Sequence, residues 1–369
     1  GIKKPMTMAE IEEKIRAGER ITEEEALFLF QSPDIHALGR MSEIVRRRWN
    51  GNLAYYIVNR HINYSNVCID SCRFCAFAQK PGQPLAFTYS LEEMLRRADE
   101  GASQGAIEFH IVGGLHPDLP YEYYLNLLRA IKTRHPDIHL KCFTAVEISH
   151  LSRMTGLSIE QVLKDLIAAG LGSLPGGGAE MFSERVRDKI CPGKLYVDEW
   201  LEVHRAAHGL GLRGNATMLY GHIEQPEEIV DHLAHLRPLQ DETGGFMTFI
   251  PLRFQSRNTR LEGVMCTGLK DLRVHAVARI YLDNFPHIKS YWTMLGVKTA
   301  QVMLRFGADD FDGTVIDEKI VHMAGSTSPK LLTVSTIQRL IREAGREPVE
   351  RDTLFHPYHR THSLPAAIA

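Results

Sequence analysis

Three of the six cysteines lie close together, as Cys68-x3-Cys72-x2-Cys75, and this spacing is the strongest chemical signal in the sequence. Thiols of an intracellular protein stay reduced, so a tight triplet binds metal more often than it forms disulfides. Three thiolates on one short loop can hold three corners of an iron–sulfur cubane and leave the fourth iron open. Because such clusters are usually ligated fully by cysteine, a missing fourth cysteine predicts an iron kept free for a substrate.

Two other interpretations of the triplet stay open from the residues alone. A structural zinc site needs a fourth cysteine or histidine, which His61 or His110 could supply. The cysteines could also be core residues that are close in sequence by coincidence. The function hypotheses are therefore an enzyme with a cluster at its active site and a non-catalytic metal- or cluster-binding sensor protein.

The composition excludes several classes of protein. The 369 residues are 44% hydrophobic and 24% charged, with a formal net charge of -2, so the chain is neither disordered nor collagen-like. Because 43 basic residues nearly balance 45 acidic ones, no global field recruits nucleic acid or a membrane surface. No run of 18 apolar residues is present, and residues 1–20 lack the apolar core of a signal peptide. We expect a cytoplasmic protein that acts on a small molecule.

A folded scaffold must position the cysteines, and the hydrophobic pattern of the sequence predicts how its parts follow one another along the chain. Amphipathic segments, with Thr22 as an N-cap and a stop at Gly51, indicate helices in the first fifty residues. The basic run at 46–48 is interpreted as a solvated face near a helix C-terminus. We expect an N-terminal helical cap (1–52), a main domain (53–330), and a C-terminal helix and tail (331–369) packing on that domain.

Short β-rich runs alternate with helical patterns over the main domain, which is typical of repeated βα units. The predicted strands cover 53–58, 107–112, 139–144, 172–174, 214–219, 247–251, 287–291 and 308–312. This alternation predicts an α/β fold whose parallel sheet closes as a (βα)8 TIM-type barrel. Barrel enzymes carry their chemistry on the loops after the strands. The cysteine triplet follows the first predicted strand, and the loop at 312–318 follows the eighth.

The pattern C-x3-C-x2-C, with Phe74 before the last cysteine and the loop after a first strand, resembles the radical S-adenosylmethionine (SAM) superfamily. The resemblance implies the TIM-type barrel of that superfamily and a [4Fe-4S] cluster held by Cys68, Cys72 and Cys75. The open iron would chelate the methionine amino and carboxylate groups of SAM. One electron would then cleave SAM to a 5'-deoxyadenosyl radical.

The same resemblance assigns further residues to SAM. Gly113 and Gly114 follow the second predicted strand, where the family lets backbone groups approach the methionine ammonium, although Leu115 replaces the usual acidic residue. Glu147, after the third strand, resembles a carboxylate that contacts SAM in related barrels; the alternative is an ordinary acid of a surface loop. A glycine run after the fourth strand either packs the flat adenine or forms a tight turn. This run is Gly176, Gly177 and Gly178.

Longer stretches narrow the resemblance to the aminofutalosine synthase family, which belongs to the futalosine pathway of menaquinone biosynthesis. The stretches are HIVGGLHPDLPYEYYLNLLRAIK, LPGGGAEMFSERVRDKICPGK, NATMLYGHIE, LQDETGGFMTFIPLRF and DGTVIDEKIVHMAGS, and they span most of the chain. Two related families share the PGGGAE region, the dehypoxanthine futalosine cyclases and the deazaflavin-forming FO synthases. These hydrogen-abstracting enzymes are the alternative, and the YGHIE, HIKSYW and HMAGS stretches favour the first family.

The resemblance implies a transferase that consumes SAM. The 5'-deoxyadenosyl radical adds to the vinyl carbon of 3-[(1-carboxyvinyl)oxy]benzoate, a dianionic enol ether. Rearrangement and decarboxylation then give 6-amino-6-deoxyfutalosine. A flavodoxin or ferredoxin is the expected electron donor. Such a site must bind two carboxylates and exclude hydrogen donors that would quench the radical.

Candidates for the substrate site are residues near the ends of strands. Arg253 is the first choice for binding a carboxylate, because a guanidinium makes bidentate contacts. His222 and His116 are expected to donate a hydrogen bond or move a proton near the departing carboxylate, unless they are structural loop histidines. Tyr220 and Trp292 are expected to stack on the benzoate, with ordinary core packing as the alternative.

Asn215 and Thr217 complete the candidate set. Side chains two residues apart on a strand point to the same face, so both enter the barrel if either does. Polar groups inside a barrel destabilise it unless a ligand or partner satisfies them, so this pair is assigned to the substrate.

Overall fold

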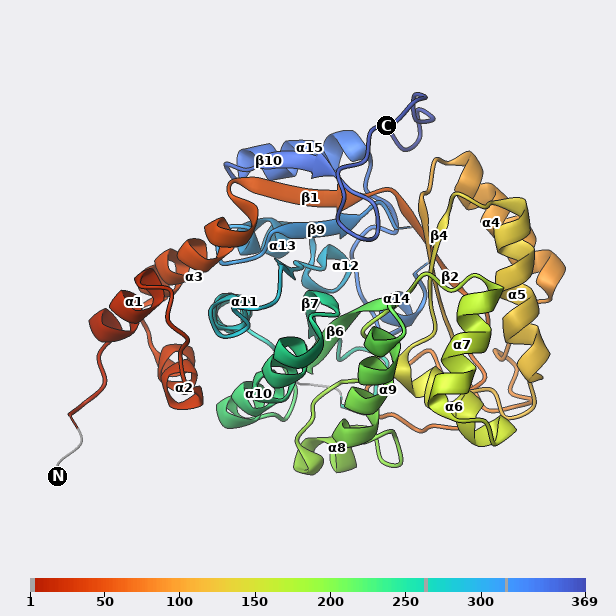
Figure 1. The fold of residues 1–369 in the computed structure, drawn as a ribbon, viewed down its shortest axis with the longest axis horizontal. Helices are drawn as coiled ribbons and strands as arrows, with labels where there is room; N and C mark the ends of the chain where they lie inside the picture. Colours follow the sequence, from red (N-terminus) through yellow and green to blue (C-terminus); the bar gives the residue numbers. More distant parts are fainter. Residues whose placement is uncertain (1–3, 262–264, 316–317) are drawn as a thin grey trace.

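A computed structural model of the chain describes residues 4–261, 265–315 and 318–369. Its centre is a curled parallel sheet with helices on the outside, and a smaller sheet lies along one edge (Figure 1). The α/β TIM-type fold that the sequence predicts is therefore confirmed. The predicted loop at 312–318 is only partly covered, because Ile316 and Asp317 lie outside the described residues.

Within the described ranges, the main sheet has seven strands in the order β2-β3-β4-β5-β6-β7-β8. The order follows the sequence, as expected when each strand is connected to the next by a helical crossover. Its strands are β2 (Asn59–Asn63), β3 (Glu108–Val112), β4 (His139–Cys142), β5 (Ser173–Leu174), β6 (Arg213–Tyr220), β7 (Phe246–Arg253) and β8 (His287–Ile288).

The smaller sheet has the order β10-β1-β9 and is also parallel. It contains β1 (Leu53–Ile57), β9 (Asp310–Gly313) and β10 (Glu347–Glu350). The strand predicted at 53–58 therefore exists as β1, but the first strand of the main sheet is β2, which follows directly. The run Asn-Arg-His-Ile-Asn gave no strand signal because its polar residues hide the alternation that marks a half-buried strand.

β9 brings the two ends of the curled sheet together. On one side, the Ser290 amide that follows β8 donates to the Asp310 carbonyl at 2.8 Å. On the other, the Thr314 amide donates to Ile57 O at 3.1 Å, at the junction of β1 and β2. The two sheets thus enclose one interior, although the hydrogen-bonded ladders divide into two groups.

Helices cover the outside of the main sheet, and most of them bury one apolar face. In α4, for example, Met94 and Ala98 are buried, and the Ser90 side chain caps the first turn. The outer helices are α4 (Leu91–Ser103), α5 (Tyr121–Arg134), α6 (Ala145–Thr155), α7 (Ile159–Ala169), α8 (Glu184–Ile190), α9 (Val197–Gly209), α10 (Pro226–Thr243) and α11 (Gly268–Tyr281). Four shorter or later helices follow, α12 (Trp292–Leu295), α13 (Val297–Met303), α14 (Ile320–Met323) and α15 (Val334–Glu343).

The N-terminal helices α1 (Met8–Arg16), α2 (Glu23–Gln31) and α3 (Ile35–Asn50) lie at one side of the barrel (Figure 1), where α2 packs against α10 and α11, α3 packs against α11, and α1 packs on α3. Arg20, between α1 and α2, pairs with Asp241 at 2.7 Å and with Asp283 at 3.0 Å. Three helices therefore make up most of the segment 8–50, as the amphipathic pattern predicts.

The interpretation of residues 46–48 as a solvated face is wrong for Arg46, which is fully buried. Its guanidinium donates to the carbonyls of Ala308, Gly51 and Leu53, at 2.9, 2.9 and 2.6 Å. A single guanidinium thus satisfies backbone acceptors where α3 ends and β1 begins. A run of like charges in the sequence gives no indication of such acceptors.

The C-terminal segment packs on the smaller sheet. Ile337 and Ile341 of α15 are fully buried and belong to a hydrophobic cluster with Tyr56 and Phe311 from β1 and β9. The domain boundaries at 52 and 330 stay a prediction. No helix in the described part of the chain has the length and apolar character needed to cross a membrane.

We predict that Ile337→Ala lowers the free energy of unfolding by about 2 to 5 kcal/mol, because it removes a fully buried side chain and leaves a cavity. The matched control is Arg339→Ala, on the exposed face of the same helix, which should change stability by less than about 0.5 kcal/mol. Urea denaturation measures both. Equal effects of the two substitutions would contradict the packing of α15 on the barrel.

Candidate active site

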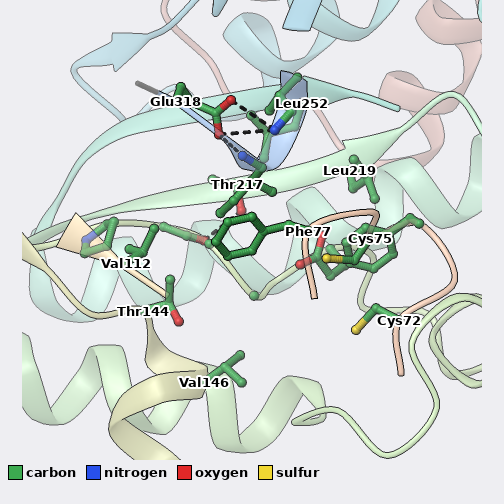
Figure 2. Close-up of a pocket in the computed structure, with 18 of the residues that line it drawn as sticks. Cys72, Cys75, Phe77, Val112, Thr144, Val146, Thr217, Leu219, Leu252 and Glu318 are labelled. Carbon is green, nitrogen blue, oxygen red and sulfur yellow. Dashed lines mark hydrogen bonds between the residues drawn. The ribbon is translucent and has the colours of Figure 1, made fainter. Parts of the chain in front are cut away.

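One cavity of about 300 Å³ opens where the main-sheet strands end, and it gathers most of the predicted site residues. Residues from separate strands and loops meet there, which is the usual position of an active site in a barrel. The predicted residues that line it are Cys68, Cys72, Cys75, Gly113, Gly114, Glu147, Gly176, Gly177, Gly178, Asn215 and Thr217. Figure 2 shows the Phe77 ring with Cys72 and Cys75 on one side of it and Val112 and Thr144 on the other.

The three cysteines stand on a loop between β2 and α4, and all three are free and partly buried. The Lys80 ammonium fixes the loop by donating to the carbonyls of Cys68, Ile69 and Asp70, at 3.1, 2.8 and 3.0 Å. Burial raises the pKa of the Cys72 and Cys75 thiols. Iron or another metal would have to displace their protons to bind.

The cysteine loop suits a cluster in its donors and its position. Thiolates are the ligands of iron–sulfur clusters, and three of them face a common cavity. In the part of the chain that the structure describes, no three His, Cys, Asp or Glu side chains are already gathered around a single ion. A cubane held by three cysteines differs from such a site, because each thiolate would bind a different iron and the fourth iron would have no cysteine.

The glycine pair after β3 packs directly against the cysteine loop. A Cβ on Gly114 would lie 2.3 Å from the carbonyl oxygen of Val67, and one on Gly113 would lie 2.7 Å from the Tyr64 ring. The Gly114 amide donates to Ser65 O at 2.9 Å. Both positions therefore require glycine, because any side chain would push the two loops apart.

Glu147 is the third residue of α6 and ties three strand ends together. One carboxylate oxygen accepts from the Tyr64 hydroxyl at 2.6 Å and from the Gly113 amide at 3.0 Å. The other accepts from the Thr144 amide at 2.7 Å, within a capping box. Burial raises the pKa of Glu147 to about 7, although these hydrogen bonds oppose the shift.

The glycine run after β5 lies against the neighbouring strand β6. A Cβ on Gly176 would lie 2.7 Å from the backbone of Asn215, and Gly178 has a φ of +88°. The Thr217 hydroxyl donates to Gly176 O at 2.7 Å. The run thus forms a close-packed wall of the cavity, and Thr217 already has a partner in that wall.

Two charged residues near the cysteines were missed by the sequence analysis. Lys194 and Glu180 pair at 2.9 Å and both line the cavity. The Lys194 ammonium lies 5.2 Å from the centre of the Phe74 ring, and the neighbouring acidic groups, Glu180 among them, raise its pKa despite its burial. Both residues belong to the stretch LPGGGAEMFSERVRDKICPGK, but nothing in their spacing indicated a pair.

A layer of ionisable side chains deeper in the barrel was also missed. His61, His110 and Lys141 are register partners on β2, β3 and β4, and they line the cavity together with Lys289 and Asp312. The signal was available, because a charged or imidazole side chain within a core strand destabilises the fold unless it has a partner or ligand. That argument was applied only to Asn215 and Thr217.

Five predicted residues are not among the described side chains that line the cavity. Arg253 is one of them, since its guanidinium pairs with Asp271 at 3.0 Å and donates to Leu295 O at 2.8 Å. Tyr220 donates to the same Asp271 carboxylate at 2.6 Å. Thr217, Leu219 and Leu252 do line the cavity, and strand alternation therefore turns Tyr220 and Arg253 outward.

The other three side chains have local partners. His222 lies beside Glu224 at 3.1 Å and contacts Leu219 O at 2.7 Å. His116 accepts a hydrogen bond from the Asp118 amide at 3.0 Å, within its own loop. Trp292 donates to Gly313 O at 3.0 Å and is fully buried in the cluster beneath the smaller sheet. These placements agree with the structural alternatives for the three residues, and the assignments to substrate and proton transfer stay predictions.

Two protein-family models match the chain, one after the other along the sequence. Residues 62–236 match the radical SAM superfamily, and residues 243–364 match the CofH/MqnC C-terminal region. The chain is 47% identical to the aminodeoxyfutalosine synthase of Thermus thermophilus, covering 96% of each chain. It is 46% identical to that of Streptomyces coelicolor, covering 94% of this chain and 92% of the relative.

Two further similarities show the breadth of the group. The 5-amino-6-(D-ribitylamino)uracil–L-tyrosine 4-hydroxyphenyl transferase of Methanopyrus kandleri is 43% identical, covering 88% of this chain and 89% of the relative. The crystal structure of methylornithine synthase superposes with a TM-score of 0.73 at 16% identity, covering 91% of this chain and 96% of the other, which is evidence for the fold alone. The chain belongs to the radical SAM superfamily and, within it, to the family of the aminodeoxyfutalosine synthases.

Proposed function

We propose that the chain adds the 5'-deoxyadenosyl radical of SAM to 3-[(1-carboxyvinyl)oxy]benzoate, with rearrangement and decarboxylation, to form 6-amino-6-deoxyfutalosine. The observation that carries this proposal is the cavity that joins the cysteine loop to the glycine walls after β3 and β5. The near full-length similarity to aminodeoxyfutalosine synthases supports the choice of reaction.

The proposed cofactor site uses the cavity wall nearest the cysteines. Cys68, Cys72 and Cys75 would hold a [4Fe-4S] cluster, which supplies one electron for the reductive cleavage of SAM when it is bound. The backbone of Gly113 and Gly114 would approach the methionine end of SAM. The run at 176–178 would pack against the adenine, since it leaves a wall without side chains.

Glu147 acts in this proposal as a positioning residue and a SAM contact. It lines the cavity, and its hydrogen bonds with Tyr64, Gly113 and Thr144 set where three loops begin. A partly protonated carboxyl can both accept hydrogen bonds and donate one to a ligand.

The remaining walls would protect a radical from quenching. Ile250, Leu252, Met294 and Val321 contribute apolar side chains to the cavity. Apolar side chains offer water no hydrogen-bond partners, so they would help to keep water from the reacting carbon. The amide of Asn215 also faces this space, and its buried Oδ1 lacks a hydrogen-bond partner among the described residues. We assign Asn215 and Thr217 to the substrate.

The proposal also covers the electron donor, the cellular compartment and the roles of the terminal segments. A flavodoxin or ferredoxin would supply the electron, and the protein would act in the cytoplasm. The segments 1–52 and 331–369 would support the barrel over 53–330 without contributing to the chemistry.

The test of the proposed function is mass analysis of an anaerobic reaction of cluster-reconstituted protein with SAM, a reductant and the enolpyruvyl benzoate. The expected product is a decarboxylated adduct that contains the adenosine. Free 5'-deoxyadenosine without an adduct would instead support a hydrogen-abstracting relative. Intact SAM in the presence of an intact cluster would favour the non-catalytic binding protein.

We predict that Cys68→Ser, Cys72→Ser and Cys75→Ser each abolish SAM cleavage, because each removes one thiolate from the proposed cluster. Cys266→Ser is the matched control, since Cys266 is partly buried but does not line the cavity formed by the described residues. SAM consumption and iron content measure the outcome. Wild-type turnover in any of the first three variants would refute the assignment of the cluster.

The raised pKa of Glu147 predicts a pH-dependent stability. Between pH 4.5 and about 7, the folded protein retains a proton that the unfolded chain releases, so stability falls as pH rises through this window. The full loss is about 3 kcal/mol for a shift of this size. Glu147→Gln lacks the titrating group and should escape that loss.

Urea denaturation of both proteins from pH 4.5 to pH 8 measures this effect. The unfolding free energy of Glu147→Gln, relative to that of the wild type, should increase as pH rises. The other titrating groups are common to both proteins and cancel in this comparison. A difference that stays constant over the range would show that the Glu147 carboxyl has an ordinary pKa in the folded protein.

A further inference from the structure

The deep layer of the cavity lies well below the cysteine loop. His61, His110 and Lys141 stand at one level of the barrel, because they are register partners on adjacent parallel strands. Gly113 comes three residues after His110, which places the glycine level about 10 Å farther along the strand direction. The cavity therefore has a cysteine end and a floor, and one elongated ligand can reach both.

The floor contains two buried ammonium groups. Lys141 Nζ lies 3.0 Å from Glu108 Oε1, and Lys289 Nζ lies 2.7 Å from Asp312 Oδ1. Both lysines line the cavity, with 6% and 3% of their surface exposed. Burial lowers the pKa of Lys141, and Lys289 is close enough to lower it further, while Glu108 opposes the shift.

Each ammonium has hydrogen-bonding capacity to spare. An ammonium carries three N–H donors, and the described residues offer Lys141 one close carboxylate oxygen. Lys289 has Asp312 at 2.7 Å and a more distant Asp310 oxygen at 3.8 Å. Unused donors of a buried cation are destabilising unless a ligand or water accepts from them.

The histidine pair beside the lysines is uncharged. The Nδ1 atoms of His61 and His110 lie 3.3 Å apart, so one imidazole must donate to the other. Burial lowers the pKa of both rings. Two neutral rings add polar edges to the floor without adding charge, and they leave the two lysines as its cationic groups.

We propose that Lys141 and Lys289 bind the ring carboxylate of the substrate at the floor of the cavity. This inference rests on the proposed function and takes over the role first given to Arg253. Radical addition requires the vinyl carbon to lie near SAM, at the cysteine end. The benzoate carboxylate is at the opposite end of that substrate, and the floor offers it donors from two cations.

A substrate pair tests the inference by equilibrium binding. The probes are 3-[(1-carboxyvinyl)oxy]benzoate and 2-phenoxyacrylate, which lacks only the ring carboxylate. Calorimetry uses the cluster-reconstituted protein with SAM and without reductant, so no chemistry occurs. The wild type should bind the benzoate about 100-fold more tightly than the phenoxy analogue, as expected for a buried charged contact.

The variant Lys289→Met/Asp312→Asn removes one ammonium together with its carboxylate, so no buried charge is left unpaired. Asparagine suits position 312, because Asp312 has a φ of +67° and asparagine tolerates that region. The double variant should lose most of the preference for the benzoate and bind 2-phenoxyacrylate almost unchanged. Lys141→Met/Glu108→Gln provides the same test if the first variant does not fold.

The matched control is Lys132→Met, a half-buried lysine of α5 that donates to Ile138 O and does not line the cavity formed by the described residues. It should keep the full preference. Equal affinity of the wild type for both probes, or an equal loss for both probes in the double variant, would overturn the inference. A different result would contradict the proposed function itself, namely that the reduced wild type forms no adenosyl adduct with the benzoate.

Discussion

The buried carboxylate of Glu147 holds the ends of three neighbouring strands in place. It accepts hydrogen bonds from Tyr64 after β2, Gly113 after β3 and Thr144 after β4. The cysteine loop begins a few residues beyond Tyr64, and Gly114 packs against that loop at a distance which excludes any side chain. The relative position of the cysteines and the glycine wall therefore depends on one carboxylate that has almost no access to solvent.

The cavity has charged side chains both at its cysteine end and at its floor. Near the cysteines, the Lys194–Glu180 pair is the charged feature, and at the floor the two lysines Lys141 and Lys289 face the ligand space with their carboxylate partners. Apolar side chains of β7 and other elements also line the cavity. This arrangement suits the proposed dianionic substrate. With its vinyl group near SAM, its ring carboxylate would meet the lysines at the floor and not an apolar wall.

The sequence was sufficient for the fold and for the cavity wall that the cysteines and glycines form, because those residues have local spacing or backbone requirements. The sequence was insufficient for residues whose function depends on which side chains lie next to them in the folded protein. Arg253 was chosen for its chemistry, yet Leu252 faces the cavity and alternation turns Arg253 toward Asp271. Lys141 lies in a predicted core strand, so the burial argument used for Asn215 and Thr217 could have singled it out, but its neighbour Lys289 is far away in sequence and only the closed sheet brings the two near each other.

The most direct test of the cysteine end is magnetic resonance of the reduced, cluster-reconstituted protein with SAM that carries 17O in its carboxylate. If Cys68, Cys72 and Cys75 leave one iron of a [4Fe-4S] cluster open, electron–nuclear double resonance should detect a hyperfine coupling between the cluster and the labelled oxygen. A cluster signal without that coupling would mean that SAM does not bind the iron, and it would contradict the central claim.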